Sequence, residues 1–457
     1  MTKIYFVAIL IFLQLTTGCK KFLTVKAPQD QLVSQIVFSD DSTATAALIG
    51  VYQTLCSHKE YFTSGNKSIT LLTGLSADEL DNYSGNFNLE EFYHNNISPI
   101  NNINSGIWDQ LYEGIYQCNS VLEGLTGSLS IATNLKQQLS GEALFLRAFF
   151  YFYLVNLYGP VPMALTTNYQ VNDTLHRSSV ETIYDQIIND LLRARQILED
   201  EYASGAERIR ANRSAVNALL ARIYLYRHYW RRSVACASLV INRSDKYKLC
   251  PQIEDVFLKN SSEAILQLQP TLPLYNTFDA DVFILNSYPT SVTCSKQLIK
   301  GFESFDRRMS GWIGRFTTGH DTFYFPYKYK VQAPNVVREY LMLFRLGELY
   351  LVRGEAYAQL GMPDSATADL NMIRIRAGLQ PMQLASKEDA LQAINKERQL
   401  ELFAEWGHRW LDLKRTGMID QTLGIHKSPW WKSSATLYPI PQSDIILNPH
   451  LTQNAGY

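Results

Sequence analysis

The sequence predicts a mostly α-helical protein in which stacked helical hairpins support a loop-rich, strand-poor region. Two observations predict this. Long stretches carry apolar residues at helical spacing and end at Gly or Pro signals. Two other stretches break that period and are rich in Asn, Ser, Gly and aromatic residues. With 457 residues, 46% of them hydrophobic, the chain is long enough for one extended domain with a sizeable core.

The helical scaffold is predicted at about 40–57, 107–243 and 338–415. Its clearest unit, Glu339–Leu379, resembles a tetratricopeptide hairpin, because Gly361 can end one helix and Pro363 suits the first turn of the next. A buried helix should end at Gly159, which begins the sequence Gly-Pro-Val-Pro. The other helices are expected at Asp41–Leu55, Ile107–Leu125, Leu135–Tyr158, Ser179–Leu198, Arg213–Arg227 and Trp230–Ile241.

The N-terminus reads as a secretory signal peptide over residues 1–18. Lys3 precedes an apolar stretch from Ile4 to Leu15, which as a helix would span only ~18 Å against ~30 Å of hydrocarbon. Cys19 directly follows Gly18 and resembles the cysteine of a bacterial lipobox, which is acylated. We therefore expect a single mature domain over residues 19–457, anchored to a membrane by a lipid on Cys19.

Composition and motifs argue against several classes of function. The 42 Lys and Arg residues nearly balance 43 Asp and Glu residues, and no basic run is interleaved with aromatics, so nucleic-acid binding is not expected. No HExxH, GxSxG, GxGxxG, P-loop or EF-hand pattern occurs, and we expect no cofactor and assign no metal ligands; a calcium ion that supports the structure or the ligand site stays an open alternative. The wide spacing and odd number of the remaining cysteines argue against a disulfide framework: Cys56, Cys118, Cys236, Cys250 and Cys294.

The segment from Ile394 to Arg415 concentrates charges and aromatics. On a continuous helix, Glu397, Glu401, Glu405 and Arg409 would share one face. Glu401 and Glu405 would then lie roughly 6 Å apart, a spacing similar to the carboxylate pair of a retaining glycosidase. Because arginines and core aromatics alternate with these carboxylates, we interpret them as a structural ion network. A break in the helix is expected at Gly407.

The two loop-rich stretches, at about 60–105 and 260–337, are the predicted binding regions. A sugar ring stacks its apolar C–H face on an aromatic plane, and its hydroxyl groups need Asn, Asp or Arg partners. Trp108 is left out, because its helical spacing indicates packing. The predicted ligand-binding residues are Tyr83, Asn86, Phe87, Tyr275, Phe278, Asp279, Tyr288, Trp312, Arg315 and Tyr324.

Several segments, taken in order, resemble signatures of one known family. They are Trp108–Asn119 (WDQLYEGIYQCN), Gly141–Pro162, Arg345–Leu379, Glu397–Arg415, and an ending with Pro439-Ile440-Pro441, Asn448-Pro449 and Gln453–Tyr457. Together they are similar to the SusD/RagB outer-membrane nutrient-binding lipoproteins of Bacteroidota. The similarity runs along the whole chain.

This resemblance implies a SusD-like fold and a function in nutrient uptake. It implies non-catalytic capture of an oligo- or polysaccharide at the outer-membrane surface, facing the cell exterior. It also implies a partner, a SusC-like TonB-dependent transporter on which the protein sits as a lid. Two alternatives stay open: a protein- or peptide-interaction scaffold of the transporter complex without a glycan site, and a secreted glycosidase with two carboxylates facing each other across a cleft.

Overall fold

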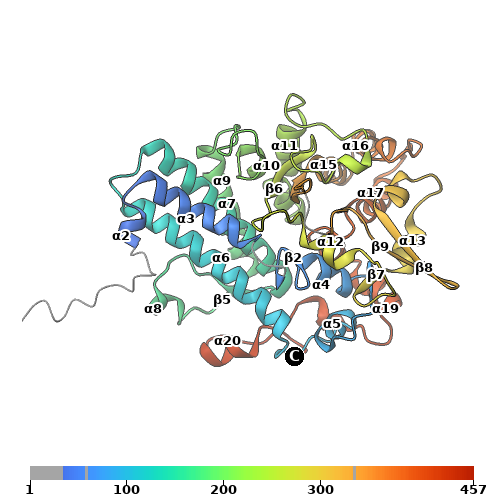
Figure 1. The fold of residues 1–457 in the computed structure, drawn as a ribbon, viewed down its shortest axis with the longest axis horizontal. Helices are drawn as coiled ribbons and strands as arrows, with labels where there is room; N and C mark the ends of the chain where they lie inside the picture. The colour runs from blue at the N-terminus through green and yellow to red at the C-terminus, as the bar shows by residue number, and fades with distance from the viewer. Residues whose placement is uncertain (1–33, 57–59, 333–335) are drawn as a thin grey trace, which may run out of the picture.

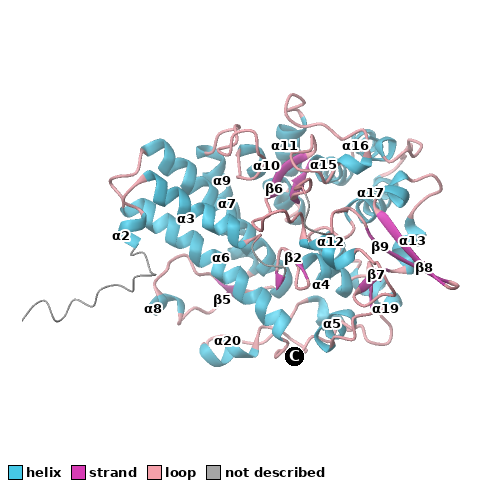
Figure 2. Ribbon diagram, viewed as in Figure 1, coloured by secondary structure: helices cyan, strands magenta, loops and turns pink. Residues whose placement is uncertain are grey.

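The computed structural model describes residues 34–56, 60–332 and 336–457 (Figure 1). Helices dominate these residues, and the strands form short pairs (Figure 2), which confirms the mostly helical fold class. The predicted signal peptide and Cys19 lie outside the described residues. No described helix is long and apolar enough to cross a membrane.

Long helices from the first half of the chain form one end of the molecule (Figure 1). One of them, α7, lies between two others, α6 and α9, and from Leu139 onward almost every side chain of α7 is buried. It ends where predicted, at Gly159, whose φ of 75° an L-residue rarely adopts. The helices of this end are α2 (Ser34–Val37), α3 (Asp41–Thr54), α6 (Asn102–Gly127), α7 (Thr133–Tyr158) and α9 (Val180–Ile197).

Helical hairpins follow one another next to this end. The α10–α11 hairpin packs against the α15–α16 hairpin through α11 and α15, and α17 packs on both helices of the latter. Gly361 and Pro363 separate α15 from α16 as predicted, whereas the tetratricopeptide character of the hairpins stays a prediction. The helices are α10 (Arg213–Tyr226), α11 (Trp230–Ile241), α15 (Leu346–Gln359), α16 (Pro363–Arg376), α17 (Lys387–Leu402) and α18 (His408–Arg415).

Two predicted helical segments are wrong in part. The start of Glu339–Leu379 is a strand, β10 (Leu341–Arg345), which pairs antiparallel with β6 (Ala264–Leu268). Every residue of both strands is buried, and a continuous apolar run does not distinguish a buried strand from a buried helix.

The second error concerns the helix expected to carry the glutamates. It ends at Leu402, and Ala404, Trp406 and Gly407 all have positive φ angles. The break therefore spans residues 403–407, and Glu405 and Arg409 do not continue the face of Glu397.

The two predicted binding regions meet in space. Strand β3 (Leu80–Asn82) from the first region pairs antiparallel with β7 (Val292–Cys294) from the second, with Leu80 opposite Cys294. The hairpin of β8 (Ile313–Thr318) and β9 (Asp321–Pro326) packs against β7 and projects from the edge of the molecule (Figure 1). The first region also holds two helices, α4 (Ile69–Ser76) and α5 (Phe87–Tyr93), so it is less loop-like than predicted.

The remaining elements are short, and several of them, such as α8, lie away from these regions (Figure 1). They are β1 (Glu60–Tyr61), β2 (Ser64–Gly65), β3 (Leu80–Asn82), β4 (Val161–Pro162), α8 (Tyr169–Asn172), β5 (Arg177–Ser178), η2 (Ile253–Asp255), α12 (Phe278–Phe283), β7 (Val292–Cys294), α13 (Lys296–Gly301), α14 (Arg307–Gly311), β8 (Ile313–Thr318), β9 (Asp321–Pro326), α19 (Ile419–His426), η3 (Ser433–Thr436) and α20 (Gln442–Leu447).

Candidate functional site

Three rings from distant parts of the chain form an exposed cluster, which we call the aromatic face: Tyr83, Tyr288 and Phe323. Phe323 lies in β9, and its ring centroid is 5.7 Å from that of Tyr83 and 5.1 Å from that of Tyr288, both edge-on. Tyr83 keeps 39% of its surface exposed and Tyr288 keeps 56%. The rings therefore support one another and still present surface to a ligand.

The chain positions the aromatic face through backbone pairing. Tyr83 directly follows β3, and its N–H donates to the carbonyl of Ser291, which precedes β7 (2.8 Å). Phe323 is held by the register of the hairpin, where it lies opposite Phe316. The face thus depends on strand pairing that joins the two predicted binding regions.

Carboxylates lie close to these rings. Partial burial raises the pKa of Tyr83, and the nearby charges of Asp81 and Asp321 raise it further. Asp81 accepts a hydrogen bond from the hydroxyl of Tyr93 (3.2 Å), and its own pKa is raised by burial. The surroundings therefore combine ring surfaces with hydrogen-bond acceptors, the mixture that polyhydroxylated ligands need.

The two other residues predicted from the first region have different surroundings. Asn86 is the N-cap of α5, and its side-chain oxygen accepts from the N–H of Asn88 (2.9 Å). Phe87 is 75% exposed, but no ring contact joins it to the aromatic face within the described residues. Asn86 therefore shapes the loop after β3, and Phe87 is free to contact a ligand.

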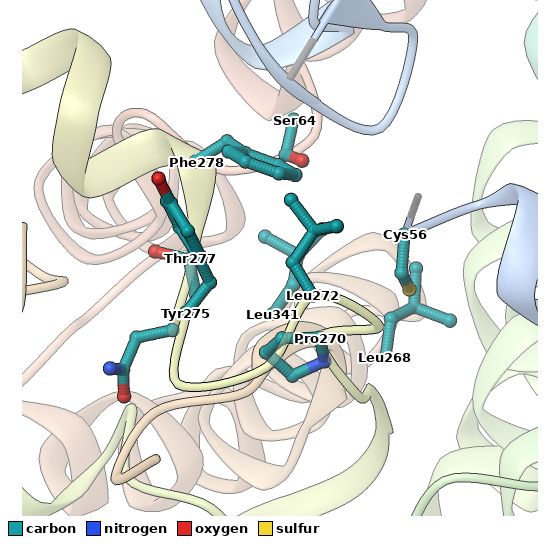
Figure 3. A pocket seen from close by; sticks show the side chains of 10 residues that line it. Cys56, Ser64, Leu268, Pro270, Leu272, Tyr275, Thr277, Phe278 and Leu341 are labelled. Carbon is teal, nitrogen blue, oxygen red and sulfur yellow. The ribbon is translucent and has the colours of Figure 1, made fainter. Parts of the chain in front are cut away.

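Tyr275, Phe278 and Asp279 do not belong to the aromatic face. Tyr275 and Phe278 line a pocket of about 20 Å³ together with Leu272 (Figure 3), which is room for about one water molecule. Asp279 is 2% exposed and accepts a hydrogen bond from the N–H of Gly65 (3.1 Å). The prediction that Phe278 and Asp279 contact a glycan is wrong for this conformation, because both are buried.

Trp312 requires the same correction. It has no exposed surface, and its indole N–H donates to the carbonyl of Ile253 (3.0 Å). The cationic groups of Lys328 and Arg376 lie 4.8 and 5.4 Å from the ring centroid. Trp312 therefore packs inside the protein against buried cations and offers no platform for a sugar.

Arg315 and Tyr324 lie directly opposite each other in the β8–β9 hairpin. Successive residues of a strand point to opposite faces, so this pair leaves the hairpin on the face away from Phe323. The predicted residues are thus divided between the aromatic face, the other hairpin face and the protein interior. Phe323 is the residue of the aromatic face that the prediction missed, and only the hairpin register identifies it.

Glu401 and Glu405 are buried in an ion network. Arg345 contacts Glu401 at 2.5 Å and Glu405 at 2.8 Å; Arg308 also contacts Glu401, at 3.2 Å, and Lys328 pairs with Glu405. Glu401 has no exposed surface and Glu405 has 7%. The prediction of a structural network is confirmed, since neither carboxylate lines an open cleft.

The described residues contain no group of three or more His, Cys, Asp or Glu side chains arranged to hold a metal ion. The five cysteines downstream of Cys19 are buried free thiols in this part of the chain.

Two family models match this chain. Residues 21–225 match a SusD-like family described as starch-binding and associating with the outer membrane, and residues 317–457 match the SusD family. The chain belongs to the SusD/RagB family. The motifs that resemble this family in the sequence lie within the two matched ranges.

Relatives and solved structures agree with this membership. SusD-like protein P25 of Formosa agariphila is 24% identical, with both chains covered completely. A SusD superfamily protein from Bacteroides vulgatus has a TM-score of 0.81 at 22% identity, covering 92% of this chain and all of that one. Surface glycan-binding protein A from Bacteroides thetaiotaomicron, solved with laminarihexaose, has a TM-score of 0.75 at 22% identity, covering 91% and 99%. These structural similarities show that the chain has a SusD-like fold.

Proposed function

We propose that this SusD/RagB-family protein captures a glycan on the aromatic face without cleaving it, at the outer-membrane surface. The observation that carries the proposal is the exposed ring cluster of Tyr83, Tyr288 and Phe323, with carboxylates of Asp81 and Asp321 nearby. Sugar C–H faces stack on such rings, and carboxylates accept hydrogen bonds from sugar hydroxyls. A relative of the same fold was solved with laminarihexaose, which supports a glycan as the ligand.

The rest of the proposal concerns location and delivery. Residues 1–18 act as a signal peptide, and a lipid on Cys19 anchors the single domain of residues 19–457 to the outer membrane, facing the exterior. The description of the matching family model, which names association with the outer membrane, supports this location. The glycan then passes to a SusC-like TonB-dependent transporter. Purifying the protein from solubilised outer membranes tests this, since a TonB-dependent barrel should co-purify in stoichiometric amount.

Binding experiments test the glycan site. Tyr83→Ala and Tyr288→Ala should each weaken binding of laminarihexaose or a starch oligosaccharide by roughly five- to tenfold in calorimetry, because each stacking ring contributes about 1 kcal/mol. Tyr169→Ala is the matched control, since Tyr169 is 69% exposed on α8, at the opposite end of the molecule (Figure 1).

Two results would contradict the proposal. Unchanged affinity in both Tyr83→Ala and Tyr288→Ala would remove the aromatic face from the site. Release of new reducing ends from a polysaccharide during incubation would contradict capture without cleavage. Glu401 and Glu405 could not account for such cleavage, because they are buried in the ion network.

A further inference from the structure

A cleft of about 800 Å³ lies on the face of the β8–β9 hairpin away from Phe323. Its walls come from the segment before α14, from α14 itself and from both hairpin strands. This hairpin lies at the edge of the molecule (Figure 1). The volume is in the range of small-molecule sites and would hold a sugar unit. The cleft is thus separate from the aromatic face.

Two arginines give this cleft its charge. Arg307 and Arg315 are both exposed and line the cleft, and neither guanidinium group makes an ion pair or hydrogen bond with a described residue. The side chain of Arg307 lies against Gly378, where a Cβ atom would come within 3.0 Å of its Nε, so packing restricts its position. An arginine side chain remains charged and offers a planar set of donors to a carboxylate, sulfate or phosphate group.

The carboxylates of the lining are already neutralised by other arginines. Asp306 accepts two hydrogen bonds from Arg308, at 3.0 and 2.8 Å. Glu303 accepts two from Arg374, at 2.8 and 3.1 Å. No other Asp or Glu side chain lines the described walls. The cleft therefore presents the positive charges of Arg307 and Arg315 without an internal counter-ion.

Aromatic surface accompanies these charges. Tyr324 stands opposite Arg315 across the hairpin, and Tyr327 lines the same cleft. The ammonium group of Lys330 lies 5.2 Å from the Tyr327 ring centroid and donates to the carbonyl of Gly311 (2.8 Å), which holds it beside this ring. A ring face beside a free guanidinium group suits a sugar that carries an anionic substituent.

We propose that this cleft, with Arg307 and Arg315 as its anion-binding residues, is a second site that takes a carboxylated or sulfated sugar unit. The proposal goes beyond glycan capture on the aromatic face, because it assigns a different surface and a charged class of ligand. The anionic group pairs with the guanidinium groups, and the sugar ring contacts Tyr324 and Tyr327.

Calorimetry with three probes tests this site: tetragalacturonate for the carboxylate, a sulfated galactan oligosaccharide for the sulfate ester, and laminarihexaose as a neutral glycan. At least one anionic probe should bind. Arg307→Ala and Arg315→Ala should each weaken it by about tenfold, and the double variant should abolish binding. Added salt should weaken the binding, since exposed charges are screened. Binding of only one anionic probe shows that the cleft recognises its group, the carboxylate or the sulfate ester, and binding of both shows that it accepts either.

Matched controls distinguish a specific binding site from non-specific electrostatic attraction of an anionic probe to the protein. Arg231→Ala removes the same charge from an exposed position on α11 and should bind the anionic probe like the wild type. Thermal melts monitored by circular dichroism establish that each variant is folded. Laminarihexaose binding measured on the arginine variants reports on the aromatic face, so failure of one site is distinguishable from failure of the other.

Four outcomes would overturn the proposal. The first is that neither anionic probe binds, and the second is that the Arg307→Ala and Arg315→Ala double variant keeps the affinity of the wild type. The third is that Arg231→Ala loses as much affinity for the anionic probe as the cleft variants. The fourth is that a single-stranded DNA oligonucleotide binds more tightly than the anionic sugars and depends on the same arginines. The last outcome would assign the cleft to nucleic acid instead.

Discussion

Arg315 and Phe316 are consecutive in β8, yet their side chains leave the hairpin on opposite faces. Arg315 is paired with Tyr324 and lines the cationic cleft, whereas Phe316 is paired with Phe323 of the aromatic face. One hairpin therefore contributes to two surfaces. Because the two surfaces share this hairpin, a long glycan with anionic groups that passes over the hairpin edge would contact the aromatic face and the cleft together.

Replacement of Trp312 should affect stability rather than ligand affinity. Because Trp312 is completely buried and its N–H bonds to Ile253, Trp312→Ala leaves a cavity and an unpaired carbonyl, and should lower the free energy of unfolding by about 3–5 kcal/mol. Urea denaturation followed by circular dichroism measures this loss. Phe87→Ala, at a residue that is 75% exposed, should change it by less than about 0.5 kcal/mol. Unchanged stability of Trp312→Ala with weakened glycan binding would restore Trp312 to the binding site.

Glu401 should be required for folding stability. Burial by itself would raise the pKa of Glu401, but the charges of Arg376, Arg345 and Arg308 outweigh it and hold this pKa below its usual range. Glu401→Gln leaves these arginines with less negative charge, and should cost about 3–5 kcal/mol of unfolding free energy in urea denaturation.

The same variant has a specific pH dependence. A lowered folded-state pKa contributes stability above the unfolded value of about 4.3, and this contribution is lost as the pH falls further. The wild type should thus lose more stability on acidification than Glu401→Gln. Glu199→Gln, at an exposed ion pair with Arg213, should leave stability nearly unchanged. An equally small effect of Glu401→Gln would argue against the structural role of the network.

The helical scaffold was largely predictable because its signals are local. Gly159 ends α7, and Pro363 begins α16, through backbone geometry that depends on few neighbours. The apolar run of β10 gave no such signal, since it is buried on all sides and its partner β6 lies more than seventy residues earlier in the chain. Its strand conformation is decided by that pairing.

The exposed aromatic residues were predictable in region but not in detail. Tyr83 and Tyr288, two of the predicted ligand-binding residues, are exposed, whereas Trp312 looked equivalent in sequence and is buried. What distinguishes them is tertiary: Trp312 packs against cations that come from three other segments. The division between Phe323 and Tyr324 depends on the register of the hairpin, which a sequence pattern of alternating aromatics does not define.

The pH dependence of folding stability can test whether the carboxyl group of Asp279 is buried. Burial raises the pKa of Asp279 to about 7, although the hydrogen bond from the N–H of Gly65 acts in the opposite direction. A raised folded-state pKa means that the wild type loses stability as the pH rises from about 4 to 7, because the folded protein holds a proton that the unfolded chain releases. Asp279→Asn stays neutral, so its stability advantage should grow across this window by about 2–4 kcal/mol and then level off.

Denaturation midpoints of wild type and Asp279→Asn at a series of pH values measure this difference. Glycan affinity should stay the same in the variant, because Asp279 is 2% exposed. A stability difference that does not change with pH, or a loss of glycan binding, would contradict the assignment of Asp279 to the interior.

The turn between α17 and α18 should tolerate no side chain at Gly407. This residue has a φ of 73°, and a Cβ atom there would lie 2.6 Å from the Oγ1 atom of Thr73, which is buried in α4 and donates to the carbonyl of Ile69. Gly407→Ala combines a strained backbone angle with this clash and should lower the unfolding free energy by about 2–4 kcal/mol in urea denaturation. Gly417→Ala is a matched control, because Gly417 has a φ of 71° but open space around it, so only the backbone cost of about 1–2 kcal/mol applies. Equal losses in the two variants would mean that the contact with Thr73 does not fix α18 against α4.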